Sequence, residues 1–286
     1  MSESRLITSG TIERLSMMNL LIPEVERIGA DALAQRSQGL EVSEKSDGSL
    51  VTNVDLAVER ALREVIGELD PDGAIVGEEE GWLDRAPCEA AWVIDPIDGT
   101  RMFVENRVGC SISVGFWSPD GAVAGIVYDM ARSVTYASDA ISNSWLCPST
   151  KPVLGTEIHG IWGLEREARF ELERRILSDL VVGHEPDGCV LEMAAVAHGQ
   201  KAGYVFAAAG WAPFPWDLAA GAALLKSVGG TLLWTDSPQG IISLQSEPLT
   251  TLEHYAACGA SDSATLIALG TQLTQDLFTE PGQLDF

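Results

Sequence analysis

The sequence predicts a protein of mixed α+β and α/β class, with two halves of different character. In the first half, two long amphipathic helices precede short strands, three of which suit an antiparallel meander. After about residue 148, helices alternate with short strands, which favours an α/β arrangement. We therefore expect an N-terminal α+β domain over residues 1–148 and a C-terminal α/β domain over residues 149–286.

Two helices are predicted near the start of the chain. The first covers residues 11–36, because apolar residues recur there at helical spacing. A polar loop follows at residues 45–49. The second helix begins after Thr52, which can act as its N-cap with Asp55 three residues on, and Pro71 ends it.

Short apolar segments predict five strands in the rest of the first half. The first two run into acidic loops, and the last three form the meander, with a hairpin turn at residues 118–121. The predicted strands are residues 74–76, 91–94, 110–117, 122–128 and 133–138.

The second half is predicted to alternate helices with strands. The predicted helices are residues 164–181, 188–199, 216–228 and 262–278. The predicted strands are residues 203–208, 231–234 and 255–259.

The composition restricts the partners and the location of the protein. A net charge of -24 argues against nucleic acid and anionic membranes as partners, because both are bound through Lys and Arg. The same charge would repel a phosphorylated metabolite unless cations reversed the local field. No apolar run approaches the roughly 20 residues of a membrane helix, and the N-terminus lacks the layout of a secretory signal. Five widely spaced cysteines without a C-x-x-C pair suit reduced thiols in a cytoplasm.

The strongest chemical signal is the segment D-P-I-D-G-T. An apolar strand would deliver Asp95 and Asp98 at its end, with Pro96 fixing the backbone between them. These carboxylates and the Ile97 carbonyl suit hard cations such as Mg²⁺. A helix beginning at residues 99–100 would offer N–H groups to phosphate oxygens. The alternative is an ordinary Asx-turn with an N-cap, which would be preferred for an isolated D-x-x-D.

Two further segments carry carboxylates. Glu78 lies in an acidic loop after a predicted strand, and Asp217 stands at the start of a predicted helix. Taken alone, these are typical of a solvated acidic turn and of an N-cap. Two neighbouring strands that both end in carboxylates favour a shared site, where charges about 4 Å apart repel by about 4 kcal/mol unless a cation lies between them. No nucleophile elbow, Walker loop or dinucleotide fingerprint competes with this reading.

These segments, in this order, strongly resemble the inositol monophosphatase family of lithium-sensitive, magnesium-dependent phosphatases. The resemblance runs from the first helix to about residue 260, and D-P-I-D-G-T combined with W-D-x-A-A-G is its most specific part. The matching segments are residues 45–55, 77–79, 95–100, 216–221 and 229–230.

The resemblance implies a ligand set for Mg²⁺. Glu78, Asp95 and the Ile97 carbonyl would bind one ion, and Asp95, Asp98 and Asp217 a second. Glu78 would also help to hold a third, weaker ion through solvent.

The resemblance also implies how water and phosphate are held. Thr100, with Glu78 and Asp55 nearby, would orient the attacking water. The amides of Gly99 and Thr100, next to Asp98, would hold the phosphate. Gly188 and Cys189 stand in a loop that helps family members to bind substrate.

Family membership would mean a five-layered αβαβα sandwich, usually a homodimer, that hydrolyses a small polyol phosphate. The sequence departs from the pattern of inositol phosphatases at residues 204–211, which contain no carboxylate and end in Trp211. A sister activity therefore stays open, on histidinol phosphate, a sugar phosphate or bisphosphate, or a 3′-phosphonucleotide. A catalytically silent metal-binding protein is the alternative from another class.

Overall fold

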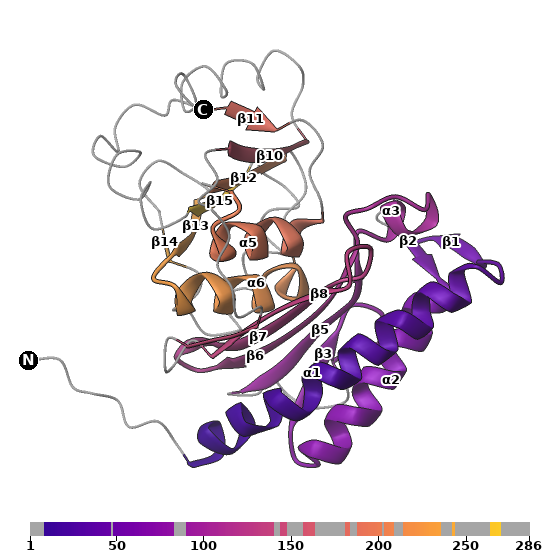
Figure 1. Ribbon diagram of the computed structural model, residues 1–286, viewed down its shortest axis with the longest axis horizontal. Coiled ribbons are helices and arrows are strands. Elements are labelled where there is room, and N and C mark those ends of the chain that lie inside the picture. The colour runs from indigo at the N-terminus through magenta and orange to yellow at the C-terminus, as the bar shows by residue number, and fades with distance from the viewer. Residues whose placement is uncertain are drawn as a thin grey trace, which may run out of the picture.

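The computed structural model shows helices and sheets stacked in layers (Figure 1). Helices α1 and α2 cover one face of a seven-stranded sheet, and α5 and α6 lie between its other face and a six-stranded sheet. The residues that the structure describes are 9–46, 48–82, 90–139, 144–147, 157–163, 181–183, 188–201, 203–208, 214–235, 242–243 and 264–269. Among the helices of these ranges, none is long and apolar enough to cross a membrane.

The two N-terminal helices form as predicted. Helix α1 (Ser9–Arg36) and helix α2 (Asn53–Leu69) bury apolar side chains against each other and against the first sheet. Thr52 is the N-cap of α2, and its hydroxyl and the Asp55 carboxylate form a capping box. Between the helices the structure adds a hairpin, β1 (Val42–Glu44) and β2 (Leu50–Thr52), where only a loop at residues 45–49 was predicted.

The seven-stranded sheet has the order β4-β3-β5-β6-β7-β8-β9. Strands β3 and β5 are parallel, and every other neighbouring pair is antiparallel, which includes the predicted meander β6-β7-β8. The strands are β3 (Ala74–Gly77), β4 (Gly81–Trp82), β5 (Ala91–Asp98), β6 (Ser111–Ser118), β7 (Gly121–Asp129), β8 (Val134–Asp139) and β9 (Ser144–Cys147).

Strand β5 is longer than predicted, because it continues through both aspartates of D-P-I-D. Its register with β6 shifts between Asp95 and Asp98. Pro96 has no N–H to give to the ladder, so an irregularity at this point is expected. The irregular end of β5 is followed by the short helix α3 (Thr100–Val104).

The six-stranded sheet has the order β11-β10-β12-β15-β13-β14. Strands β11, β10 and β12 are parallel, and β15 runs antiparallel to β12 and β13. The strands are β10 (Glu157–Gly163), β11 (Val181–Gly183), β12 (Gly203–Ala208), β13 (Thr231–Thr235), β14 (Ile242–Ser243) and β15 (Ala264–Leu269). The helices are α5 (Cys189–His198) and α6 (Pro215–Ser227), both close to their predicted bounds.

The predicted helix over residues 262–278 is wrong where the structure describes it. Residues 264–269 form β15, which lies between β12 and β13 and pairs with both. A short apolar run is compatible with a buried strand or a buried helix, and here the partners on both sides decide it. Of the predicted helix over residues 164–181, only Val181 is described, and it is the first residue of β11. The predicted strand over residues 255–259 lies outside the described residues.

A buried apolar core joins the two halves of the chain. Helix α6 packs on β6 and β7 of the first sheet and also contacts β13 of the second. The close approach requires glycine: a Cβ at Gly125 would lie 2.4 Å from the Ala220 carbonyl oxygen, and one at Gly115 would lie 2.7 Å from the Ala219 Cβ. The predicted fold class is thus confirmed, with four consecutive layers in the described residues.

Candidate active site

Three aspartates from two distant segments meet between the first sheet and α6. Asp95 and Asp98 come from the end of β5, and Asp217 comes from the first turn of α6. One carboxylate oxygen of each lies within 4.8 Å of the others. Asp95 and Asp98 are buried and Asp217 is half-buried.

Asp98 is held by the start of α5. Its Oδ2 accepts a hydrogen bond from the Val190 amide at 2.9 Å and from the Ser111 hydroxyl at 3.4 Å. A Cβ at Gly188 would lie 2.3 Å from the same oxygen, so glycine is needed there for the carboxylate to fit. Burial raises the pKa of Asp98 to about 7, opposed by the Val190 amide and reinforced by the Glu78 carboxylate. The structure therefore puts Gly188 and Cys189 next to Asp98.

Asp95 has an unsatisfied oxygen. Its Oδ1 is buried and has no hydrogen-bond partner among the described residues. Burial, followed by the carboxylates of Glu78, Asp98 and Asp217, raises its pKa well above the usual range. A buried carboxylate among carboxylates, with a lone pair unused, suits a cation.

Asp217 is oriented by its own helix. Its Oδ2 accepts a hydrogen bond from the Phe214 amide at 2.6 Å, and the Phe214 ring stacks on Trp216 at 4.8 Å between centroids. Burial and the carboxylates of Glu78 and Asp98 raise its pKa well above the usual range. Asp217 is therefore not the N-cap. Phe214 is the N-cap, and Asp217 lies three residues further on, at the third helical position, where it bonds back to the cap.

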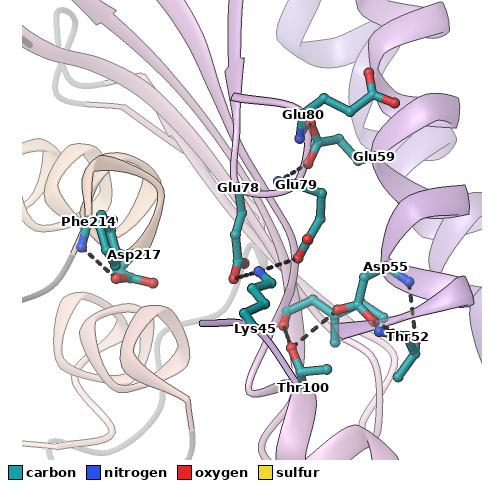
Figure 2. Close-up of polar contacts among 11 residues, drawn as sticks. Lys45, Thr52, Asp55, Glu59, Glu78, Glu79, Glu80, Thr100, Phe214 and Asp217 are labelled. Carbon is teal, nitrogen blue, oxygen red and sulfur yellow. Dashed lines mark hydrogen bonds and ion pairs between the residues drawn. The ribbon is translucent and has the colours of Figure 1, made fainter. Parts of the chain in front are cut away.

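A lysine that the sequence analysis did not assign to the site lies between two glutamates (Figure 2). Lys45, in the β1–β2 hairpin, places its Nζ 2.7 Å from Glu78 Oε1 and 2.7 Å from Glu79 Oε1. Burial lowers the pKa of Lys45, but the two carboxylates outweigh it and raise the pKa above its ordinary value. Burial raises the pKa of Glu79 to about 7, against the effect of Lys45.

Thr100 connects helix α2 to the end of β5 (Figure 2). Its hydroxyl lies 3.2 Å from Asp55 Oδ1 and 3.1 Å from the Ile97 carbonyl oxygen. The other Asp55 oxygen, Oδ2, accepts the Thr52 amide at 2.8 Å in the capping box. Gly99 precedes Thr100 in the chain, and its φ of 82° lies in the left-handed region, which favours glycine.

Of the remaining candidate residues, Cys189 lies beside Asp98, and those after β12 lie outside the described part of the chain. Cys189 is buried and free, and burial raises the pKa of its thiol well above the usual range. Trp211 and the rest of the predicted substrate stretch after β12 lie outside the described residues. Lys45 and Ser111 were missed as site residues; Lys45 falls within a matching segment, whereas Ser111 carries no signal beyond its place in a strand.

The oxygen donors of this cluster suit a hard divalent cation. Carboxylates and a backbone carbonyl are the ligands that Mg²⁺ and similar ions prefer, and no thiol or imidazole belongs to the three-aspartate group. The unpaired Asp95 oxygen and the raised pKa values are what a cation would relieve. The cluster could therefore hold a metal ion.

Comparison with known proteins identifies the family. The family model described as the inositol monophosphatase family matches residues 16–271. The chain belongs to the inositol monophosphatase family. This confirms the resemblance, and the members of this family are metal-dependent phosphatases.

Three relatives show how the chain relates to the family. The Bacillus subtilis inositol-1-monophosphatase is 29% identical over 250 residues, which cover 84% of this chain and 89% of the relative. The Nus factor SuhB of Pasteurella multocida is 28% identical over 227 residues, which cover 75% and 83%. The crystal structure of a Staphylococcus aureus inositol monophosphatase II with inositol monophosphate bound superposes with a TM-score of 0.64 at 25% identity, over 92% of this chain and 93% of that one.

Proposed function

We propose that this protein is a Mg²⁺-dependent phosphomonoesterase that hydrolyses a small polyol phosphate. The observation that carries the proposal is the meeting of Asp95, Asp98 and Asp217, from the two halves of the chain, within 4.8 Å. Such a cluster in a protein with a net charge of -24 has little use without a cation, and family membership links the cation to phosphate.

The proposed ligands are the residues expected from the sequence. Glu78, Asp95 and the Ile97 carbonyl would hold one Mg²⁺, and Asp95, Asp98 and Asp217 a second, with Glu78 near a weaker third. When bound, the ions supply positive charge for the phosphate and lower the pKa of a bound water.

The residues beside the cluster would position water and phosphate. The Thr100 hydroxyl directs its proton toward Asp55 Oδ1 or the Ile97 carbonyl, which leaves its lone pairs to accept a hydrogen bond from water. The amides of Gly99 and Thr100 would bind phosphate oxygens, beside Gly188 and Cys189. Water attacks phosphorus in line, the ester P–O bond breaks, and inorganic phosphate and the free alcohol leave.

The substrate class rests on the relatives. An inositol-1-monophosphatase and a structure with inositol monophosphate bound both favour a polyol phosphate. The absence of a carboxylate at residues 204–211 keeps the sister substrates as test compounds. Inhibition by lithium, a homodimer and a cytoplasmic location are part of the same proposal and rest on family membership.

The test is phosphate release from a panel of substrates. The full chain is assayed with inositol phosphate, histidinol phosphate, a sugar phosphate, a bisphosphate and a 3′-phosphonucleotide, with Mg²⁺ or EDTA, and with or without lithium. We expect Mg²⁺-dependent release that is fastest with the polyol phosphate and is inhibited by lithium. Faster release from another compound of the panel would change the proposed substrate but keep the proposed phosphatase activity. No release from any member, with Mg²⁺ bound in calorimetry, would favour a silent metal-binding protein and overturn the proposal.

A further inference from the structure

The loop that carries Glu78 has little in its own sequence to fix it. Residues 78–80 join β3 to β4 and are three successive glutamates, which repel one another. The Glu78 amide continues the pairing of β3 with β5 by donating to the Ile94 carbonyl at 3.2 Å. The next two amides point away from that ladder. Their partner must come from elsewhere in the fold.

That partner is Glu59 of helix α2 (Figure 2). Its Oε2 accepts the Glu79 amide at 2.8 Å and its Oε1 accepts the Glu80 amide at 3.1 Å. The Glu59 side chain is fully buried, with 0% of its surface exposed. One carboxylate therefore holds two successive amides directly after Glu78, which fixes the backbone on both sides of that residue.

Arg63 completes the arrangement from the next turn of α2. Its guanidinium donates to Glu59 Oε1 from Nε at 2.9 Å and approaches the same oxygen from Nη2 at 2.8 Å. Nη2 also donates to the Gly81 carbonyl at 2.9 Å, at the far end of the loop. Glu59 and Arg63 together therefore bind two amides at the start of the loop and the Gly81 carbonyl at its end.

Gly77 shows how closely the carboxylate approaches the backbone. A Cβ at this position would lie 2.1 Å from Glu59 Oε1 and 2.4 Å from its Cδ. Gly77 does not have a positive φ, so its backbone conformation does not require glycine. Glycine is required because any side chain would collide with the Glu59 carboxylate. The sequence of the loop and that of the helix are therefore matched to each other.

From this geometry we infer that Glu59 is a positioning residue, which sets the place of Glu78 at the metal centre. Its ion pair with Arg63 and the space left by Gly77 hold its carboxylate where this is possible. The inference rests on the proposed function, because Glu78 is a ligand only if a cation binds. A buried ion pair contributes little net stability compared with well-packed apolar residues, so its use is better sought in what it orients. Partners that orient metal ligands typically change cation affinity by about 10–100-fold.

Two variants break the arrangement from opposite sides. Glu59→Gln combined with Arg63→Gln removes both charges and so avoids leaving a buried guanidinium unpaired. Gly77→Ala leaves both charges in place and displaces the carboxylate. Glu64→Gln, on the exposed face of the same helix, and Arg60→Gln, which removes an exposed ion pair to Glu80, are the matched controls.

Binding of Mg²⁺ to the full chain is measured by calorimetry after removal of metal with EDTA. We expect the dissociation constant to rise about tenfold or more in both test variants and to stay within about twofold in both controls. The Mg²⁺ concentration for half-maximal turnover should rise in parallel, while kcat at saturating Mg²⁺ stays within a few-fold of the parent. A variant that merely lost its fold would lower kcat as well, and would not change the Mg²⁺ requirement alone. Thermal unfolding in EDTA checks that the variants fold.

The outcomes separate this inference from the proposed function. A parent chain that binds no Mg²⁺ would overturn the proposed function and the inference with it. A parent that binds Mg²⁺, with folded variants of unchanged affinity, would overturn the inference alone. If neither test variant folds, the Glu59–Arg63 pair serves the stability of the fold, and the inference is overturned as well.

Discussion

Asp95 is buried, and its Oδ1 has no hydrogen-bond partner in the part of the chain that the structure describes, which is costly for a metal-free carboxylate. We expect Asp95→Asn to lower Mg²⁺-dependent turnover by at least about a hundredfold, the scale seen when a single electrostatic group at a reacting centre is removed. Thermal stability in EDTA should stay the same or rise, because a charge that repels its neighbours is lost. Asp120→Asn, at the exposed turn between β6 and β7, is the control. Turnover equal to that of the control would remove Asp95 from the site.

Asp98 should make the metal-free protein less stable as the pH rises. Its pKa is raised by burial to about 7 in the folded chain, whereas the unfolded chain releases this proton at about pH 4. The folded state therefore holds more protons between these values. The contribution to stability is complete below about pH 4 and is lost as the pH rises to about 7.

The measurement is the free energy of unfolding in EDTA across that pH range. Asp98→Asn should have a shallower decline than the parent, and added Mg²⁺ should flatten the parent curve. An equal decline in the variant would show that the proton is held elsewhere.

Helix α6 positions Asp217, and two glycines of the sheet allow it to lie close enough. Gly115→Ala or Gly125→Ala should destabilise the fold by about 1–3 kcal/mol, the usual cost of overpacking a dense core. Either change should also weaken Mg²⁺ binding, because the helix is pushed away from β5.

The matched control for these changes is Gly67→Ala on α2. No atom of the described residues lies within 4 Å of a Cβ at Gly67, and the φ of Gly67 is not positive. We expect it to stabilise the fold by about 0.4–1 kcal/mol, through the lower entropy of the unfolded chain. Chemical unfolding of the three variants measures the difference, and equal effects at all three sites would contradict the packing of α6.

Elements differ in how much of them the sequence alone could predict. Thr52 and Asp55 predict the start of α2, because a capping box is a local pattern that spans only four residues. Strand β15 could not be predicted in this way, because its six residues suit a strand only between β12 and β13. The β1–β2 hairpin was missed for a similar reason: its strands are three residues long, and its importance lies in Lys45 reaching two glutamates of another loop.

At the scale of the whole molecule, the site exists only where the two halves of the chain meet. Binding of Mg²⁺ should therefore stabilise the folded state, by about 2.7 kcal/mol at a hundredfold excess over the dissociation constant. Asp217→Asn should remove most of this gain, although it lies far along the chain from Asp95. Thermal unfolding with increasing Mg²⁺ measures the effect, with Ca²⁺-free buffer and EDTA as the reference. A gain that survives in the variant would mean that the first half binds the cation alone.

The sequence by itself determined the family, the succession of most helices and strands, and the carboxylates at the ends of elements. These are local patterns, and Asp95, Asp98 and Asp217 could be found because each stands at the boundary of a predictable element. The tertiary structure decided which side chains share a space: Lys45 with Glu78, Ser111 with Asp98, and Glu59 with the loop at residues 78–80. These pairs are 13 to 33 residues apart in sequence and lie together because sheet pairing and helix packing bring them there. No local pattern encodes such distances, because burial and charge act between neighbours in space.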